Sequence, residues 1–215
     1  MSDRSLNAQT LLAGYASGIF PMSHDRNDPE IFWVRPEERG IIPLDGFHLS
    51  RSLKKRIRKD QPVIRVNSCF PDILRACADR EETWINQRIF DLYCDLHDMG
   101  FAHSVEVFTR ENELWGGVYG VSMGGAFFGE SMFSTRTDGS KIALTFLVAR
   151  LNAGGYRLFD AQFQTDHLAS LGAIEISRSD YEMRLKDALG VTADFFNLPA
   201  SADFHSVMQL TTQTS

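Results

Sequence analysis

The sequence LWGGVYGV (residues 114–121), the turn SMGG (122–125) and the sequence AFFGESM (126–132) decide the fold of this chain. Two apolar, glycine-rich segments of strand length flank a short turn, a pattern that predicts an antiparallel hairpin. A third apolar segment, His103 to Phe108, precedes the hairpin and is joined to it by a turn at residues 109–112. We therefore expect three consecutive antiparallel strands.

Helical and extended patterns alternate on both sides of this meander. Helices are expected before it at residues 70–79 and 86–99, and after it come a helix through 142–151, a strand at 156–163, a short helix, a strand at 173–176 and a helix around 181–185. An antiparallel meander followed by alternating helices and strands is typical of an α+β layered domain. We place this larger domain at residues 63–190.

A smaller N-terminal α+β domain is expected at residues 1–62. The spacing of Ala8, Leu11, Tyr15 and Ile19 predicts an amphipathic helix, and residues 31–34 and 40–44 resemble short strands. The segment at residues 191–215 is rich in Thr, Ser and Gln towards its end, and we expect this tail to be partly disordered.

The composition of the 215 residues, with 43% apolar and 23% charged side chains, is ordinary for a soluble globular protein. No apolar run approaches the ~20 residues that cross a bilayer, and the start shows no signal peptide. The cysteines Cys69, Cys77 and Cys94 form no C-x-x-C pair, which favours reduced thiols in a cytoplasmic protein. We expect Cys69 and Cys77 to pack on a helix face.

A net charge of −6 argues against indiscriminate coating of nucleic acid, but one strongly basic segment exists. Residues 51–59 hold six cations in nine positions, with Leu53 and Ile57 as an apolar stripe and Ser50 as a plausible N-cap. A solvated helix face and a contact to a phosphate backbone explain this segment equally well.

Glu130 and the pair Asp160 and Gln162 carry the most informative polar groups. Glu130 interrupts an aromatic, glycine-loosened strand, and residues two apart on a strand share a face, so Asp160 and Gln162 are expected to point into one space. An acid and an amide beside an apolar cleft can hold an amine and a carbonyl in register, which indicates a group-transfer site. A rim charge at Glu130 and a structural hydrogen bond at Asp160 are the alternatives.

Metal and nucleotide-cofactor sites are not indicated. The six histidines show no H-x-x-x-H or H-E-x-x-H spacing, and no Walker A or dinucleotide-binding glycine motif follows a strand. Ser140 and Lys141 are adjacent on one predicted helix and therefore point in different directions. We therefore expect neither a metal site nor a nucleotide-phosphate cradle.

Several motifs together resemble the bacterial leucyl/phenylalanyl-tRNA–protein transferases. In chain order they are GIFP (18–21), Trp33, LDGFHLSRSL (44–53), TWI (83–85), the segment from Leu96 to Glu106, GGVYGV (116–121), GESMFS (129–134) and the segment from His167 to Ala173. The resemblance runs from about residue 8 to 186. It implies a small N-terminal domain and a C-terminal domain similar to the GNAT (acyl-CoA N-acyltransferase-like) fold.

The resemblance also implies an activity and its partners. The chain would move leucine or phenylalanine, with methionine as a further substrate, from aminoacyl-tRNA to the N-terminal Arg or Lys of acceptor proteins, marking them for N-end-rule degradation. Such enzymes need no cofactor, and we expect a monomer that does not bind membranes. A coenzyme-A-dependent N-acetyltransferase is disfavoured because the [QR]-x-x-G-x-[GA] loop is missing. A non-catalytic tRNA-binding adaptor is the second alternative.

The resemblance assigns roles by position. Glu130 would bind the amino group of the aminoacyl moiety, and Trp84 and Tyr93 would lie near the terminal adenosine. Two departures are that Met22 stands where some relatives have Trp, and that the N-terminal extension of longer relatives is missing. An apolar pocket for the transferred side chain would be lined by Val118, Phe127, Glu130, Met132, Leu147 and Phe159. The tRNA backbone would contact Arg51, Lys54, Lys55, Arg56, Arg58 and Lys59.

The expected reaction is aminolysis of an ester by a free α-amine, whose reference pKa of ~7.7–8.0 makes deprotonation easy near neutral pH. We hypothesise that Gln162 accepts a hydrogen bond from the attacking amine and that Asp160 orients and polarises Gln162. An amide is a very weak base, so a ribose hydroxyl of the tRNA is an alternative carrier of the proton.

Overall fold

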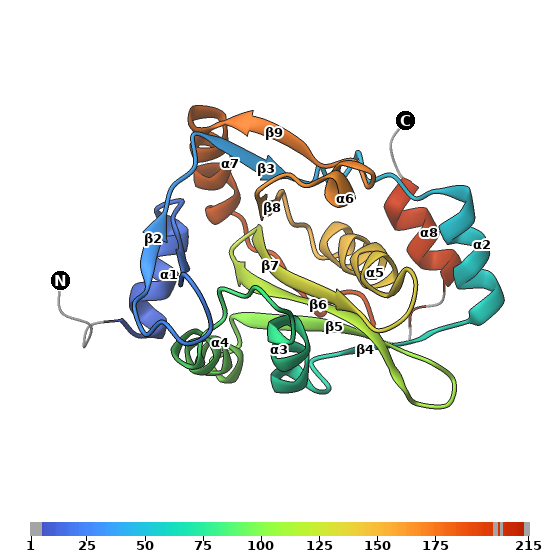
Figure 1. Ribbon diagram of the computed structural model, residues 1–215. Helices are drawn as coiled ribbons and strands as arrows, with labels where there is room; N and C mark the ends of the chain where they lie inside the picture. The colour runs from blue at the N-terminus through green and yellow to red at the C-terminus, as the bar shows by residue number, and fades with distance from the viewer. Residues whose placement is uncertain (1–5, 200–201, 203, 213–215) are drawn as a thin grey trace.

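The computed structural model describes residues 6–199, 202 and 204–212. A seven-stranded sheet with the order β4-β5-β6-β7-β8-β3-β9 forms the centre, and a two-stranded sheet lies beside it (Figure 1). The described strands are β1 (Phe20–Met22), β2 (Phe32–Val34), β3 (Glu38–Ile41), β4 (Val63–Val66), β5 (Ala102–Phe108), β6 (Leu114–Met123), β7 (Ala126–Ser134), β8 (Leu158–Gln162) and β9 (Ile174–Ser177).

The predicted meander is confirmed, because β5 pairs antiparallel with β6 and β6 with β7. The sheet is mixed, since β8 pairs parallel with β7, whereas β3 pairs antiparallel with both β8 and β9. The parallel connection needs a crossover, and the helix α5 (Gly139–Ala153) supplies it. The sequence pattern did not indicate β1, nor that β3 would enter the large sheet between β8 and β9.

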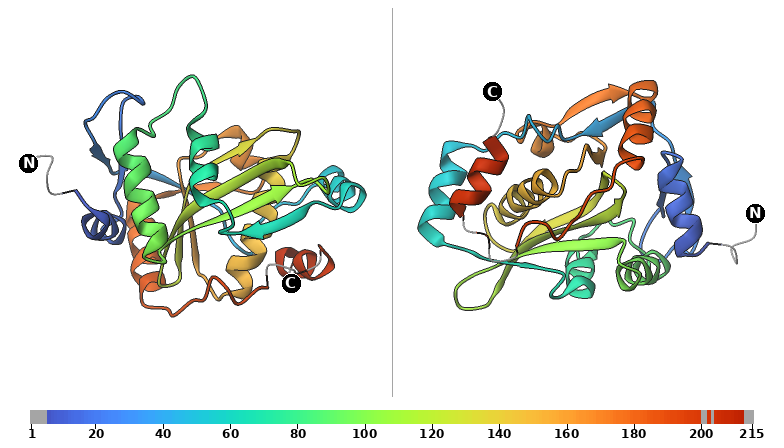
Figure 2. Two further views of the ribbon diagram at one scale, coloured as in Figure 1. Left: turned by 90° about the horizontal axis from the view of Figure 1, so that it is seen from below. Right: turned by 180° about the vertical axis from the view of Figure 1, so that it is seen from behind.

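The helices cover both faces of the sheet. They are α1 (Ala8–Ala16), α2 (Arg51–Asp60), α3 (Phe70–Ala78), α4 (Gln87–Asp98), α5 (Gly139–Ala153), α6 (Asp166–Ala169), α7 (Arg178–Leu189) and α8 (Phe204–Thr212). Figures 1 and 2 show α5 along one face, and α3 and α4 along the other. Nearly all of α5 is buried, as expected for a helix that is apolar on every side.

Two hydrophobic cores follow from the alternation of side chains along the strands. Val118 and Phe127 face the core around α5, whereas their neighbours Tyr119 and Phe128 face the core formed with α1, α3, α4 and α7. Cys77 is buried in the second core, and Cys69 and Cys94 are half-buried. The strands β6 and β7 therefore hold the two layers of helices together.

The chain has a small N-terminal part and a larger C-terminal part with the mixed sheet. The helix α1 and the hairpin of β1 and β2 form a small unit at the edge, whereas β3 lies within the large sheet and Leu53 and Ile57 of α2 pack into the core around α5. The boundary at residue 62 stays a prediction, although both of these elements precede it and contact the larger part.

The tail departs from the expected disorder where it is described. The helix α8 packs on α5, and Val207 is fully buried in the core around α5. The remaining positions of the tail, 200–201, 203 and 213–215, lie outside the described residues. In the described part of the chain, no helix is both long enough and apolar enough to cross a membrane.

Candidate active site

Glu130 occupies a β-bulge in β7. Tyr119 of β6 pairs with Ser131 and the next residue, Gly120, pairs with Gly129, so Glu130 is the extra residue without a cross-strand partner. A bulge bends the strand and re-aims a side chain. A Cβ on Gly120 would lie 2.2 Å from the Phe128 carbonyl oxygen, so this close backbone approach requires glycine.

The carboxylate of Glu130 is held by three donors from three different elements. The hydroxyl of Tyr15 (α1) donates to Oε1 at 2.6 Å, the hydroxyl of Tyr93 (α4) to Oε2 at 2.7 Å, and Nε2 of Gln162 (β8) to Oε1 at 3.0 Å. Both tyrosines are fully buried. Burial raises the pKa of Glu130 to about 7, and the three hydrogen bonds only partly oppose this rise.

A count of protons agrees with the raised pKa. The two tyrosine hydroxyls also lie 2.5 Å from each other, so three oxygen–oxygen contacts join Tyr15, Tyr93 and Glu130. Two tyrosines bring only two hydroxyl protons. When Glu130 is protonated, it can donate to one tyrosine, which then donates to the other, so that all three contacts are hydrogen bonds. A carboxyl group with a pKa near 7 is poised to exchange its proton at neutral pH, as acid–base groups in active sites are.

Asp160 and Gln162 are linked through the backbone. Oδ1 of Asp160 accepts the backbone N–H of Gln162 at 2.8 Å, while Arg39 binds both oxygens of Asp160 at 2.9 and 2.6 Å and the hydroxyl of Tyr181 donates at 2.7 Å. Asp160 is fully buried. We expected Asp160 and Gln162 to share one space, but their side chains contact different partners. Gln162 has φ +64°, which ends the regular alternation of β8 at this residue.

A small apolar pocket adjoins Glu130. Its volume is about 70 Å³, and its walls are Ile42, Val118, Gly129, Glu130, Ser131, Met132, Leu144, Phe159, Ala161 and Leu168. Of the predicted pocket residues, Val118, Glu130, Met132 and Phe159 line it, whereas Phe127 and Leu147 are buried in the core around α5. Leu144 lies one helical turn before Leu147 and takes the place that we expected for Leu147.

The two predicted aromatic contacts to adenosine differ in exposure. Trp84 is half-buried in the loop before α4, and its ring lies 6.4 Å from that of Tyr93. Tyr93 itself is fully buried and bound to Glu130, which does not fit the expectation that its ring stacks on a base. The same loop adjoins the pocket, because Arg80 donates to the Ser131 hydroxyl at 3.0 Å and to the Met132 carbonyl at 3.1 Å.

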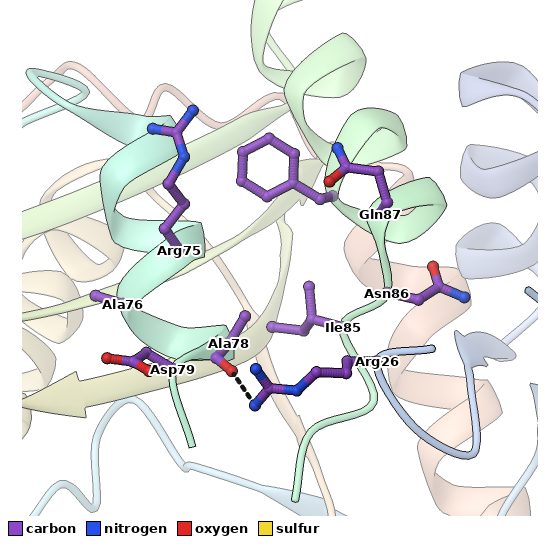
Figure 3. Close-up of a pocket in the computed structure, with 9 residues that line it drawn as sticks. Arg26, Arg75, Ala76, Ala78, Asp79, Ile85, Asn86 and Gln87 are labelled. Atoms are coloured by element: carbon purple, nitrogen blue, oxygen red, sulfur yellow. Dashed lines mark hydrogen bonds between the residues drawn. The ribbon is translucent and has the colours of Figure 1, made fainter. Parts of the chain in front are cut away.

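A larger cavity of about 590 Å³ lies between α3, α4 and the loop that carries Arg26. Figure 3 shows Arg26 and Arg75 on its walls, with the Arg26 guanidinium bound to the carbonyl of Ala78 at 3.4 Å. None of Glu130, Asp160 and Gln162 lines this cavity. The small pocket beside Glu130 is therefore the better candidate for chemistry, although its volume is much smaller.

The basic helix α2 lies at the end of the molecule opposite to α1 (Figure 1). Arg51, Lys55, Arg58 and Lys59 are exposed, whereas Lys54 and Arg56 are half-buried. Arg56 is the most constrained of these, since its Nε binds Asp138 at 2.7 Å. The exposed members form a cationic face that remains open to an anionic partner.

Sequence reasoning missed Arg39, Tyr181 and Tyr15 as parts of the site. Tyr15 was expected only as one of the apolar positions of the first helix. Arg39 has no distinguishing pattern around it, and its pairing with Asp160 depends on β3 lying next to β8. These contacts become visible only in three dimensions.

Two family models match the chain. The model described as leucyl/phenylalanyl-tRNA protein transferase matches residues 41–186, and the model of the N-terminal domain of the same transferase matches residues 4–37. The chain is also similar to curated proteins named leucyl/phenylalanyl-tRNA–protein transferase. The one from Ruegeria sp. (strain TM1040) is 59% identical over 98% of this chain and 100% of its own length. The one from Maricaulis maris is 54% identical over 99% of this chain and 100% of its own length.

Similarity to solved structures is weaker. The structure of L-PGS from Bacillus licheniformis covers 75% of this chain and 55% of that chain, with 16% sequence identity and a TM-score of 0.43. A score at this level carries no argument about the fold family, so the expected likeness to the GNAT fold stays a prediction.

Proposed function

The chain belongs to the leucyl/phenylalanyl-tRNA–protein transferase family, and from this premise we infer that it is an aminoacyltransferase that moves an amino acid from tRNA to the N-terminus of a protein. The family that the sequence motifs indicated is thereby confirmed. The observation that locates the reaction in the molecule is the half-buried carboxyl group of Glu130 beside an apolar pocket, with Gln162 bound to it.

The pocket beside Glu130 is the site for the transferred side chain. Its walls are apolar apart from Glu130 and Ser131, which suits leucine, phenylalanine or methionine. Apolar pockets discriminate by shape at ~1–3 kcal/mol per methylene, so one pocket accepts several large, unbranched apolar side chains. The narrow volume of about 70 Å³ means that Met132 or Leu144 must move when a side chain as large as phenylalanine enters.

Glu130 receives the amino group of the aminoacyl ester. In the ionised form its oxygens accept from Tyr15, Tyr93 and Gln162, and these contacts fix the carboxyl plane before substrate arrives. An amine that donates to the carboxylate replaces the proton that the free carboxyl group holds. The two tyrosines act as positioning residues for Glu130, since they contact it and are themselves buried.

Gln162 orients the attacking amine. Its Nε2 is engaged by Glu130, which leaves Oε1 as the acceptor for the N–H of the acceptor protein. Asp160 fixes the backbone of Gln162 and does not contact its side-chain amide in the free protein. Catalysis by orientation suits this reaction, because a free α-amine is already a good nucleophile near neutral pH. The proton that leaves the amine passes to a hydroxyl of the tRNA ribose or to Glu130.

The tRNA is held through its backbone and its end. The exposed cations of α2, Arg51, Lys55, Arg58 and Lys59, contact phosphates, and Lys54 and Arg56 contribute from its half-buried sides. Trp84, half-buried in a loop that adjoins the pocket, stacks on the terminal adenine. The protein acts in the cytoplasm as a monomer.

The acceptor is a protein whose first residue is Arg or Lys, and the added residue marks it for N-end-rule degradation. Exposed carboxylates support a cationic acceptor, because Glu81 and Glu82 lie in the same loop as Trp84. Asp160 does not contribute to this preference, since its charge is neutralised by Arg39.

The experiment follows radiolabelled leucine from leucyl-tRNA to a protein that starts with Arg, beside the same protein starting with Ala. Label on the Arg protein alone supports both the reaction and the acceptor rule. Equal label on both proteins contradicts the acceptor rule but not the transfer. Label on neither, from a folded protein that still binds leucyl-tRNA, contradicts the transferase activity and favours a non-catalytic adaptor.

A further inference from the structure

Arg39 is a charged side chain in the interior of the protein. It is 1% exposed, and its guanidinium carbon lies 4.6 Å from the centroid of the Phe20 ring and 4.5 Å from that of the Tyr181 ring. Nε and Nη2 bind the two oxygens of Asp160 at 2.9 and 2.6 Å, in the bidentate geometry that arginine favours. A buried ion pair is costly to desolvate, so its presence is by itself weak evidence of a stabilising role.

The pair with Arg39 determines what Asp160 can do. Burial alone would lower the pKa of Arg39, but the neighbouring Asp160 carboxylate reverses this, and the pKa of Arg39 is raised. The two oxygens of Asp160 are occupied by Arg39, the hydroxyl of Tyr181 and the backbone N–H of Gln162. A carboxylate with these partners is a fixed acceptor rather than a mobile base.

The backbone of Gln162 needs such an anchor. Its φ of +64° lies in the left-handed region, which non-glycine residues rarely adopt without support. One support is the hydrogen bond of 2.8 Å from its N–H to Asp160. The second is Gly40, which pairs with Gln162 across the sheet, and where a Cβ would lie 2.6 Å from the carbonyl carbon of Phe163. Adjacent residues of β3 thus hold the chain on both sides of this turn.

We propose that Arg39 is a positioning residue of the transfer reaction, acting through Asp160 to fix the backbone turn that presents the side chain of Gln162 to Glu130 and the attacking amine. This inference rests on the proposed function for the role of Gln162. It adds that a residue remote from the substrates, on the neighbouring strand β3, determines the orientation of the acceptor oxygen.

Arg39→Lys is the decisive variant, because lysine keeps the positive charge but cannot bind both oxygens of Asp160 in a planar fork. Arg150→Lys is the matched control. Arg150 is also a buried arginine, 3% exposed, but it binds the carbonyl groups of Phe195 and Leu198 and none of the proposed site residues. Tyr181→Phe is the milder second variant, since it removes one donor to Asp160 without changing any charge.

The measurements are kcat and KM for leucyl-tRNA and the acceptor, thermal unfolding, and hydrogen exchange of the backbone at residues 158–164. For Arg39→Lys we expect kcat to fall about tenfold to a hundredfold, as misplaced reacting groups cause. Both KM values should stay within about twofold, because the pocket and the cationic helix are untouched. The N–H of Gln162 should exchange faster. Tyr181→Phe should lower kcat several-fold, and Arg150→Lys should leave kcat and this exchange as in the wild type.

The proposal is overturned if folded Arg39→Lys keeps the kcat and the exchange rate of the wild type, or if Arg150→Lys lowers kcat equally. Should Arg39→Lys not fold, an unchanged kcat and exchange rate in Tyr181→Phe overturn it. The exchange measurement does not depend on activity. If the wild type transfers no leucine but exchange at Gln162 is faster only in Arg39→Lys and Tyr181→Phe, the proposed function fails while the positioning of Gln162 by Arg39 and Asp160 stands.

Discussion

Nε2 of Gln162 donates to Oε1 of Glu130 at 3.0 Å, and this bond joins the bulge of β7 to the end of β8. Both residues occupy irregular backbone positions, a bulge at Glu130 and a left-handed turn at Gln162. Strained or irregular backbone tends to gather at functional sites, where it aims side chains that regular strands cannot aim. The proposed transfer chemistry depends on this pair.

Removing the carboxyl group of Glu130 should change how stability depends on pH. Its pKa in the folded protein is about 7, against a reference value of 4.5, so between these pH values the folded state holds a proton that the unfolded state has lost. The contribution of Glu130 to the free energy of unfolding therefore decreases as pH rises from about 4.5 to 7. Glu130→Gln should lack this decrease, as measured by urea unfolding at several pH values.

His103 changes stability with pH in the opposite direction. The quantity to compare is therefore the difference in the free energy of unfolding between the wild type and Glu130→Gln. Burial lowers the pKa of His103 to about 4, so the unfolded state binds a proton first and stability rises with pH between about 4 and 6.5. This effect is common to the wild type and Glu130→Gln and cancels in the difference. A difference in the free energy of unfolding that does not change from pH 4.5 to 7 would contradict the raised pKa of Glu130.

Leu144→Phe should make the pocket selective. Leu144 lines the small pocket, and a larger ring there occupies space that the transferred side chain needs. We expect kcat/KM for phenylalanyl-tRNA to fall about tenfold to a hundredfold, and kcat/KM for leucyl-tRNA to fall less. The control is Met183→Phe, because Met183 is 59% exposed on α7 and does not line the pocket. Equal losses for both aminoacyl-tRNAs would argue against a pocket that holds the transferred side chain.

Lys55→Ala and Lys59→Ala should weaken tRNA binding in a salt-dependent manner. Each removes an exposed cation of α2, and each phosphate contact contributes about one unit to the slope of log Kd against log salt. Binding titrations at several salt concentrations provide the slopes. Arg35→Ala is the control, since Arg35 is an exposed cation that lies outside α2 and is paired with Glu182. Identical slopes in all variants would remove α2 from the tRNA interface.

Trp84→Ala should raise the KM for aminoacyl-tRNA. The loss of one stacked base corresponds to ~1–3 kcal/mol, or roughly a tenfold to hundredfold weaker interaction. A short aminoacyl-adenosine substrate should lose as much as the full tRNA, because the contact lies at the terminal nucleotide. Phe196→Ala, at an aromatic residue that is 59% exposed after α7, is the control and should leave both substrates unaffected. A loss with the full tRNA alone would place Trp84 away from the adenosine.

The sequence predicted the meander well because its information is local. Apolar segments and glycine-containing turns specify β5, β6 and β7 one after another, and the aromatic surroundings already marked Glu130. The apolar spacing of Phe204, Val207 and Met208 was hidden by the polar composition of the tail, so α8 was missed. Composition alone does not reveal a short helix whose stability comes from packing on the hydrophobic core.

The remainder of the site depends on contacts between distant parts of the chain. Arg39 meets Asp160 only because β3 is inserted between β8 and β9, and Tyr15 meets Tyr93 only because α1 packs beside α4. The prediction that residues two apart share a face also assumed a regular strand through Gln162, whereas the backbone of Gln162 has a positive φ. Contacts between distant segments leave no local sequence pattern. The sequence therefore indicated Asp160 as a site residue but not its pairing with Arg39.

The role of Glu130 is tested most sharply by single-turnover transfer of labelled leucine from leucyl-tRNA to a protein with an N-terminal Arg, by the wild type and by Glu130→Gln at pH 8. Fluorescence titration shows in parallel that both proteins bind the charged tRNA. We expect rapid transfer by the wild type and a rate lower by about a hundredfold in the variant, because a neutral amide cannot accept the aminoacyl amino group as a carboxylate does. Equal rates for both proteins would contradict the central place of Glu130.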